Sequence, residues 1–215
     1  MFRRLFGIFC GLAAAFFLAL IAADARALQI TLRDTDGKPV ADAVIGLIAA
    51  NPTTTKPRPA TMGQRDLTFV PHVLAVQTGA DVAFENSDAT RHHVYSFSPP
   101  KRFDIQMPTG EKPRHEIFDK PGVVAMGCNI HDNMLGFLVI MDTPHLAVSN
   151  AAGVSDLGEV PDGTYTARLW HERSRAAGAT AEMTVRVWGG AIEGFNAIMD
   201  LKPERHGNPV ERRAY

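Results

Sequence analysis

The shortness of the apolar segments constrains the fold most. Past residue 27 they are brief, often alternate with polar residues, and are separated by Gly, Pro, Asn and Asp. None shows the spacing of an amphipathic helix, so the sequence predicts an all-β protein. We expect strands over residues 28–33, 43–50, 67–70, 73–77, 81–86, 92–96, 122–127, 136–141, 147–148, 163–171, 181–187 and 191–201.

Three segments read as connections. Residues 51–59, NPTTTKPRP, are rich in Pro and Thr and predict a linker, because Pro cannot donate to a central strand. Residues 98–112 hold three prolines and mixed charge, which predicts a long surface loop. The polar tail, residues 202–215, is expected to be mobile.

The N-terminus has the pattern of a signal peptide. Arg3 and Arg4 precede an apolar run over residues 11–23, and Ala25-Arg26-Ala27 forms an A-x-A cleavage pattern. The run is short for a bilayer span, so we expect cleavage after residue 27 and no membrane insertion afterwards. The mature chain, starting at Leu28, is then periplasmic or secreted, and Cys10 leaves with the peptide.

The charge balance argues against polyanionic partners. The full chain has 22 Lys and Arg against 23 Asp and Glu; cleavage removes three basic residues and one acidic residue, leaving 19 against 22, a net charge of about −3. This balance argues against binding to nucleic acid or to an anionic membrane. The remaining 188 of 215 residues suffice for one large or two small cores.

Cys128 is the single cysteine of the mature chain, so no internal disulfide can form in an oxidising compartment. It begins the pattern C-x-x-H-x-x-M with His131 and Met134, placed between two apolar strands. A short loop can turn all three side chains toward one point. Thiolate, imidazole and thioether are soft ligands that favour copper over magnesium or calcium, and a thioether argues against zinc.

A trigonal copper site needs a second imidazole, and the stretch NSDATRHHVYSF offers His92 and His93 at a strand start. Adjacent strand residues face opposite sides, so one of the two is expected to reach the metal. Taken singly, a lone Cys or Met is more often ordinary core and a lone His solvated. The remaining histidines lack partners at ligand spacing and are read as solvated or structural: His72, His115, His145, His171 and His206.

The stretches GQRDLTFVPHVLAVQTGADVAFENSDATRHHVYSF and FDKPGVVAMGCNIHDNMLGFLVIMD resemble plastocyanin-like cupredoxins, most closely those labelled methylamine utilisation proteins. The resemblance covers residues 62–142 and implies a Greek-key β-sandwich. It rests on Phe84, Asn86 and Asp88 in F-x-N-x-D, and on a C-x-x-H-x-x-M loop spaced as in amicyanin. It implies four metal ligands: His92, Cys128, His131 and Met134. Two departures are His93 in place of the usual Asn, and Met126-Gly127 in place of aromatic residues.

The flanks resemble a second module. DTDGKPVADAVIGLI and AVSNAAGVSDLGEVPDGTYTARLWH are similar to carboxypeptidase-regulatory-like sandwiches. This resemblance implies a second, smaller immunoglobulin-like β-sandwich, discontinuous over residues 28–50 and 143–201, with the cupredoxin inserted. Two consecutive domains are the rival arrangement. The module has no cluster of ionisable residues that reads as a site, so we interpret it as structural or docking.

The ligand set predicts one copper ion, cycling between Cu(I) and Cu(II) in a type 1 (blue) site. An exported one-electron carrier is the expected function, and a periplasmic copper carrier or sensor is the alternative. An enzyme is not expected, because the chain lacks His-x-His and His-Cys-His clusters and its single mature cysteine excludes a binuclear centre.

The resemblance further implies how this carrier meets its partner. A protein redox partner would dock near His131, on an apolar patch that Ile130, Met134, Leu135 and Phe137 could supply. Asn86 would hydrogen-bond next to Cys128 and tie the two ligand segments together. The oligomeric state is left open by the sequence.

Overall fold

The computed structural model describes residues 27–51 and 55–204. Apart from one 3-10 turn at Ala177–Ala179, every regular element in these ranges is a strand, which confirms the predicted all-β class. No helix in these ranges is long and apolar enough to cross a bilayer. Residues 1–26 of the predicted signal peptide and residues 205–215 of the predicted tail lie outside the described residues.

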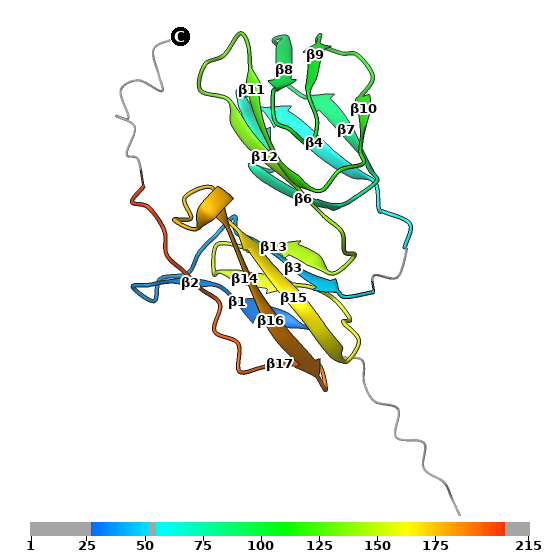
Figure 1. Ribbon diagram of the computed structural model, residues 1–215. Coiled ribbons are helices and arrows are strands. Elements are labelled where there is room, and N and C mark those ends of the chain that lie inside the picture. Colours follow the sequence, from blue (N-terminus) through cyan, green and yellow to red (C-terminus); the bar gives the residue numbers. More distant parts are fainter. Residues whose placement is uncertain (1–26, 52–54, 205–215) are drawn as a thin grey trace, which may run out of the picture.

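Figure 1 shows two β units stacked on one another, which we call the upper sandwich (residues 60–141) and the lower sandwich (residues 28–49 and 146–199). The first sheet of the upper sandwich has the order β10-β7-β4-β5, and the second has the order β6-β12-β11-β8-β9. The first sheet contains β4 (Ala60–Arg65), β5 (Thr68–Val70), β7 (Ala80–Asn86) and β10 (Arg114–Phe118). The second contains β6 (Val73–Gln77), β8 (His92–Ser96), β9 (Phe103–Met107), β11 (Gly122–Cys128) and β12 (Leu135–Met141).

Buried and more exposed residues alternate along these strands, and the buried ones form the core of the upper sandwich. In β7, Ala80, Val82 and Phe84 are buried, whereas the residues between them are exposed or half-buried. Full burial of a side chain such as Phe84 stabilises the fold by roughly 1.5–3 kcal/mol. The chain crosses repeatedly between the two sheets, and β4 with β7 and β6 with β12 pair in parallel across long sequence separations. The result is a Greek-key β-sandwich.

The lower sandwich is one five-stranded sheet covered by two short ribbons. The sheet has the order β13-β3-β15-β16-β17, and the ribbons pair β1 with β14 and β2 with β18. The sheet strands are β3 (Val44–Ala49), β13 (Leu146–Val148), β15 (Gly163–Trp170), β16 (Thr180–Trp188) and β17 (Ala191–Glu193). The ribbon strands are β1 (Gln29–Thr31), β2 (Arg33–Asp34), β14 (Val154–Asp156) and β18 (Ile198–Met199). One hydrophobic core joins residues 28–47 to residues 157–199, so the segments that flank the upper sandwich pack together.

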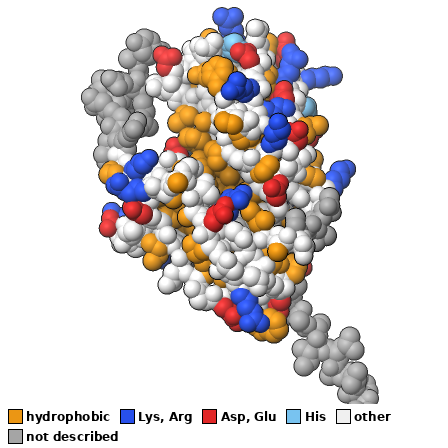
Figure 2. Space-filling view, in the orientation of Figure 1, with side chains coloured by type: hydrophobic (Ala, Val, Ile, Leu, Met, Phe, Trp, Pro, Cys, Tyr) orange, Lys and Arg blue, Asp and Glu red, His pale blue; other side chains and the backbone are white. Residues whose placement is uncertain are grey.

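A third apolar cluster lies where the two sandwiches meet. Val73 and Val139 of the upper sandwich pack there against Val44 and Trp170 of the lower sandwich. Gly46 on β3 allows a close approach, because a Cβ at this position would overlap the sulfur of Met141 on β12. Figure 2 shows hydrophobic side chains gathered near the middle of the visible face, at the level of this junction in Figure 1.

Four strands were not predicted from the sequence: β4, β9, β10 and β14. The single strand predicted over residues 191–201 is wrong, because β17 and β18 are separate strands of different sheets. The predicted surface loop over residues 98–112 is wrong, because it contains β9. Phe103, Ile105 and Met107 alternate with Asp104 and Gln106, a strand pattern that the flanking prolines obscured. The Ala and Gly residues of β4, and the exposed polar residues of edge strand β10, give much weaker patterns.

Candidate metal centre

Sheet register brings His92 and Cys128 to the same end of the upper core. His92 opens β8 and Cys128 closes β11, and these strands are antiparallel neighbours with Cys128 opposite Val94. Cys128 lies on the same face of the sheet as Val94, its partner, and so does His92, two residues before Val94. His92 and Cys128 therefore both face the core, and both are buried. His131 lies three residues beyond Cys128, in the loop before β12, and is half-buried.

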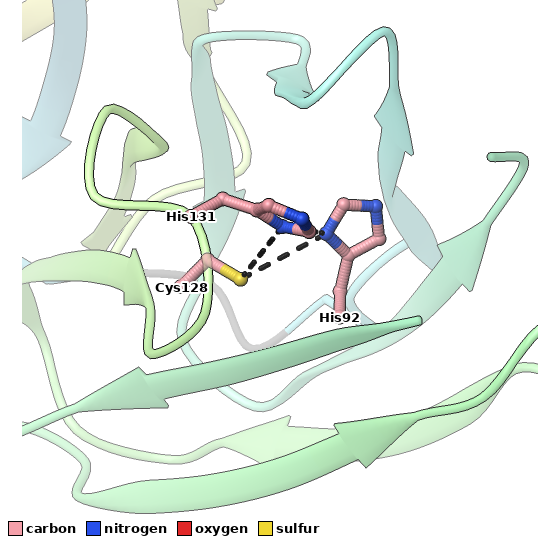
Figure 3. A group of neighbouring side chains, drawn as sticks. All are labelled: His92, Cys128 and His131. Carbon is pink, nitrogen blue, oxygen red and sulfur yellow. Dashed lines mark hydrogen bonds between the residues drawn. The ribbon is translucent and has the colours of Figure 1, made fainter. Parts of the chain in front are cut away.

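Three donor atoms converge at this end of the sandwich (Figure 3). Nδ1 of His92 and Nδ1 of His131 are 3.1 Å apart, and the Cys128 Sγ lies 3.8 Å from the first and 3.6 Å from the second. A triangle with these sides has its centre about 2.0 Å from each corner, near the roughly 2.0–2.3 Å at which first-row metals bind imidazole and thiolate. The three side chains therefore fit one metal ion.

A hydrogen bond fixes the tautomer of His92. Its Nε2 lies 2.8 Å from Oδ2 of Asp88, and a carboxylate can only accept, so Nε2 carries the proton. In the neutral ring the lone pair is then on Nδ1, the atom nearest to Nδ1 of His131. Two nitrogen lone pairs that face each other at 3.1 Å need a proton or a cation between them.

Asp88 also binds the turn between β4 and β5. Its carboxylate accepts the backbone N–H groups of Asp66 (2.7 Å) and Leu67 (3.2 Å). Burial alone would raise the pKa of Asp88, but the hydrogen bonds from His92, Leu67 and Asp66 together lower it. Asp66 and Leu67 both have positive φ, the conformation of a two-residue I′ hairpin, and the carboxylate satisfies the N–H groups that this turn exposes.

Backbone hydrogen bonds hold the ligand loop. The N–H of Asn129 donates to the carbonyl of His93 (3.0 Å), and the N–H of Met134 donates to the carbonyl of His131 (3.1 Å). The first bond joins the two ligand segments directly.

The expectation that Asn86 joins these segments is wrong. Its Nδ2 donates to the carbonyls of Thr90 (2.8 Å) and Met107 (3.0 Å). These two bonds close the β7–β8 turn and link it to β9.

The two adjacent histidines point to opposite sides, as expected from strand alternation. His92 joins the cluster, whereas His93 pairs through Nε2 with Asp104 on β9. Among the described residues, His92, Cys128 and His131 form the one group of His, Cys or acidic side chains with three donor atoms within 4.8 Å of one another.

Met134 is placed differently from the other three predicted ligands. It is only 3 % exposed, immediately precedes β12, and belongs to the same core cluster as Cys128. Its role as a fourth, axial ligand stays a prediction.

Four of the remaining histidines lie in the described part of the chain, and two of them have acidic partners. His115 lies 3.0 Å from Asp81, and His72 lies 3.2 Å from Glu172. Burial lowers the pKa of His145 and His171. The His72–Glu172 pair spans 100 residues, so sequence spacing gave no signal for it. His206 lies outside the described residues.

The donor set determines which metals fit. A thiolate and two imidazoles, with no carboxylate oxygen among them, suit copper or zinc rather than magnesium or calcium. Three donors around a shared centre leave room for a weak axial group. His92 and Cys128 belong to strands of a packed sandwich, so their positions would change little with the charge of a bound ion.

Comparison with known proteins gave structural neighbours alone, since neither a family model nor a curated protein matches. A purple cupredoxin from Nitrosopumilus maritimus is 20% identical over 38% of this chain and 99% of its own, with a TM-score of 0.34. Amicyanin from Paracoccus versutus is 13% identical over 45% and 97%, with a TM-score of 0.33. A copper-containing nitrite reductase from Thermus scotoductus is 26% identical, with a TM-score of 0.37, over 45% of this chain but only 25% of its own. The chain is thus similar to cupredoxins at low identity.

Proposed function

We propose that this chain is an exported, mononuclear type 1 copper protein that carries single electrons between protein partners. The observation that carries the proposal is the convergence of two imidazole Nδ1 atoms and one thiol sulfur, with edges of 3.1, 3.6 and 3.8 Å. Export rests on the leader pattern in residues 1–27. We assign no catalytic residue.

Each ligand has a role in this proposal. Bound copper would supply a one-electron couple between Cu(II) and Cu(I). His92, oriented by Asp88, and Cys128, at the end of β11, would keep two donors fixed in both oxidation states. Met134 would supply the weak axial contact that tunes the reduction potential. His131, the half-buried ligand, would provide the route for the electron to the surface.

The docking surface is proposed around His131. Ile130 and Leu135, beside the ligand loop, are 41% and 48% exposed and supply an apolar patch. Two residues expected in this patch do not belong to it. Met134 is buried in the upper core, and Phe137 packs at the junction between the sandwiches.

The finer family assignment also belongs to the proposal. We assign residues 62–142 to the plastocyanin-like cupredoxins of the methylamine utilisation type, on the motif residues Phe84, Asn86 and Cys128. The flanking segments, residues 28–50 and 143–201, are proposed to form one discontinuous carboxypeptidase-regulatory-like domain. Their shared hydrophobic core supports this division over two consecutive domains.

The first test is the visible and EPR spectrum of the purified protein with one equivalent of Cu(II). We expect an intense thiolate-to-copper band that His92→Ala abolishes and that the matched variant His93→Ala retains. A colourless protein, or a band that depends on His93, would overturn the assignment. A band with slow self-exchange and rapid loss of copper to a chelator would instead favour a copper carrier or sensor.

A further inference from the structure

The His72 ring connects the lower sandwich to the end of the ligand loop. It lies between β5 and β6 of the upper sandwich, and its Nδ1 is 3.2 Å from the carbonyl oxygen of Leu135. Its Nε2 is 3.2 Å from Oε1 of Glu172, which follows β15 of the lower sandwich. One imidazole therefore spans the junction between the two sandwiches.

Leu135 is close in sequence and in the sheet to three proposed ligands. It follows Met134 directly and begins β12, and it pairs with Gly127, the residue before Cys128. The carbonyl of His131 accepts the N–H of Met134, so the loop is continuous with this strand start. A shift of Leu135 would move both ends of the loop.

Further contacts hold His72 in place. The N–H of Phe137 donates to the carbonyl of His72 (2.9 Å), and the two rings meet edge to face with centroids 5.5 Å apart. Phe137 in turn packs on Trp170 of β15, with centroids 5.2 Å apart. The ring cannot leave Leu135 without disturbing this apolar junction.

The two acceptors define the charge of the ring. A carbonyl oxygen and a carboxylate oxygen only accept, so both ring nitrogens must carry hydrogen for both bonds to form. The hydrogen bond that His72 donates to Glu172 raises the pKa of His72 against the opposing effect of burial, and the charges of Glu172 and Asp42 act in the same direction. Glu172 is also faced by His171 and Arg173, and its own pKa is lowered chiefly by the His72 hydrogen bond.

We propose that Glu172 and His72 are positioning residues for the ligand loop, through which the lower sandwich sets the properties of the metal centre. This inference rests on the proposed copper function and gives the lower sandwich a role in it beyond docking. While the ring is charged, it anchors the Leu135 carbonyl. When the ring loses its proton, one of the two bonds is lost, so the ring no longer links Glu172 of the lower sandwich to the Leu135 carbonyl.

The test compares Glu172→Gln with Glu182→Gln, a matched control on β16 whose carboxylate pairs with Arg168. In the copper-loaded protein the reduction potential is measured across pH 5 to 9. We expect the potential to change with pH as His72 titrates, and this change to move to lower pH in Glu172→Gln but not in the control. A potential whose pH profile is the same in all three proteins would overturn the inference.

A second readout does not need copper. Backbone amide NMR shifts of residues 131–136 are recorded in the metal-free protein, and we expect them to change in Glu172→Gln and to stay fixed in Glu182→Gln. If the protein fails to bind copper but these shifts change, the proposed function is wrong and the anchoring stands. If the protein binds copper and these shifts do not change, the inference is wrong. Glu172→Asp, which keeps the charge but shortens the side chain, replaces Glu172→Gln if the latter does not fold.

Discussion

Oδ2 of Asp88 accepts the Nε2–H of His92 across 2.8 Å, from the turn that precedes β8. The His92 side chain has no exposed surface, and that of Asp88 is only 12% exposed. Asp88 also holds two N–H groups of the β4–β5 turn, so one carboxylate links that hairpin to a proposed ligand. The orientation of a proposed ligand thus depends on Asp88, which is not one of the three converging donors.

Replacement of Asp88 by Ala should weaken copper binding. Without the carboxylate, His92 can rotate or change tautomer, and loss of a comparable partner of a ligating histidine typically costs about 10–100-fold in metal affinity. Competition with a chelator measures this loss. Asp81→Ala, which removes the exposed partner of His115, is the control and should leave the affinity unchanged. Equal affinity in both variants would show that Asp88 does not orient the ligand.

Met134→Leu should raise the reduction potential and retain the blue absorption band. The substitution nearly conserves volume, so the buried site should lose less than about 1.5 kcal/mol of stability. Removal of a weak thioether donor leaves three ligands and disfavours Cu(II), which raises the potential. Cyclic voltammetry measures the shift. An unchanged potential would mean that Met134 is ordinary core rather than an axial ligand.

The sequence predicted the convergence of His92, Cys128 and His131 better than it predicted the strands. The spacing of Cys128, His131 and Met134 is local, and a loop between two strands preserves such a pattern. His92 lies 36 residues from Cys128, but each is the end residue of a strand whose alternation is visible in the sequence. By contrast, β4 pairs with β7 through backbone groups, and its core face carries Met62 and the polar Gln64. Such a strand is stabilised by its neighbours and shows no clear pattern of its own.

The contacts of His72 could not be read from the sequence either. Its two partners, Leu135 and Glu172, lie 63 and 100 residues away, and neither stands in a motif. The pairing depends on how the upper and lower sandwiches stack, which side-chain packing at Val139 and Trp170 decides. Local patterns predict elements and turns, whereas this contact is a product of tertiary packing.

Gln64→Met should stabilise the metal-free protein. The Gln64 side chain is fully buried on β4, and neither of its amide atoms has a hydrogen-bond partner among the described residues. An unsatisfied buried polar group costs about 1–3 kcal/mol, which an apolar side chain of similar length avoids. Urea unfolding measures the gain, and Gln106→Met on the exposed face of β9 is the control. A loss of stability in Gln64→Met relative to this control would contradict the cost assigned to the unpaired amide.

Leu135→Lys should slow electron exchange without altering the copper spectrum. Leu135 is 48% exposed beside the ligand loop, and its contact with His72 uses the backbone carbonyl, which the substitution keeps. A charge in the apolar patch must be desolvated when two molecules meet, which weakens their encounter. NMR line broadening in mixed Cu(I) and Cu(II) samples gives the self-exchange rate. Ile117→Lys, 58% exposed on edge strand β10, is the control, and equal rates in both variants would place the docking surface elsewhere.

The stability contributed by the His72–Glu172 pair should depend on pH in a defined window. The pKa of His72 is raised from 6.5, so its contribution is fully present below pH 6.5 and is lost as pH rises through the folded-state pKa. The pKa of Glu172 is lowered from 4.5, so its contribution is present above pH 4.5 and is lost as pH falls through the folded-state value. The difference in unfolding free energy between wild type and Glu172→Gln should therefore be largest between pH 4.5 and 6.5.

Because both side chains are about a third exposed, solvent screening limits this difference to about 1 kcal/mol or less. Denaturant unfolding at pH 5.5 and pH 9 measures it, and Glu182→Gln corrects for the general loss of one acidic charge. Burial lowers the pKa of His145, which is present in both proteins and cancels in the difference. The charge of Glu172 also acts to raise the pKa of His171, so the difference includes the loss of this smaller effect, which has the same sign. A difference that grows toward pH 9 would contradict the charged state of His72 and the anchoring of Leu135 that depends on it.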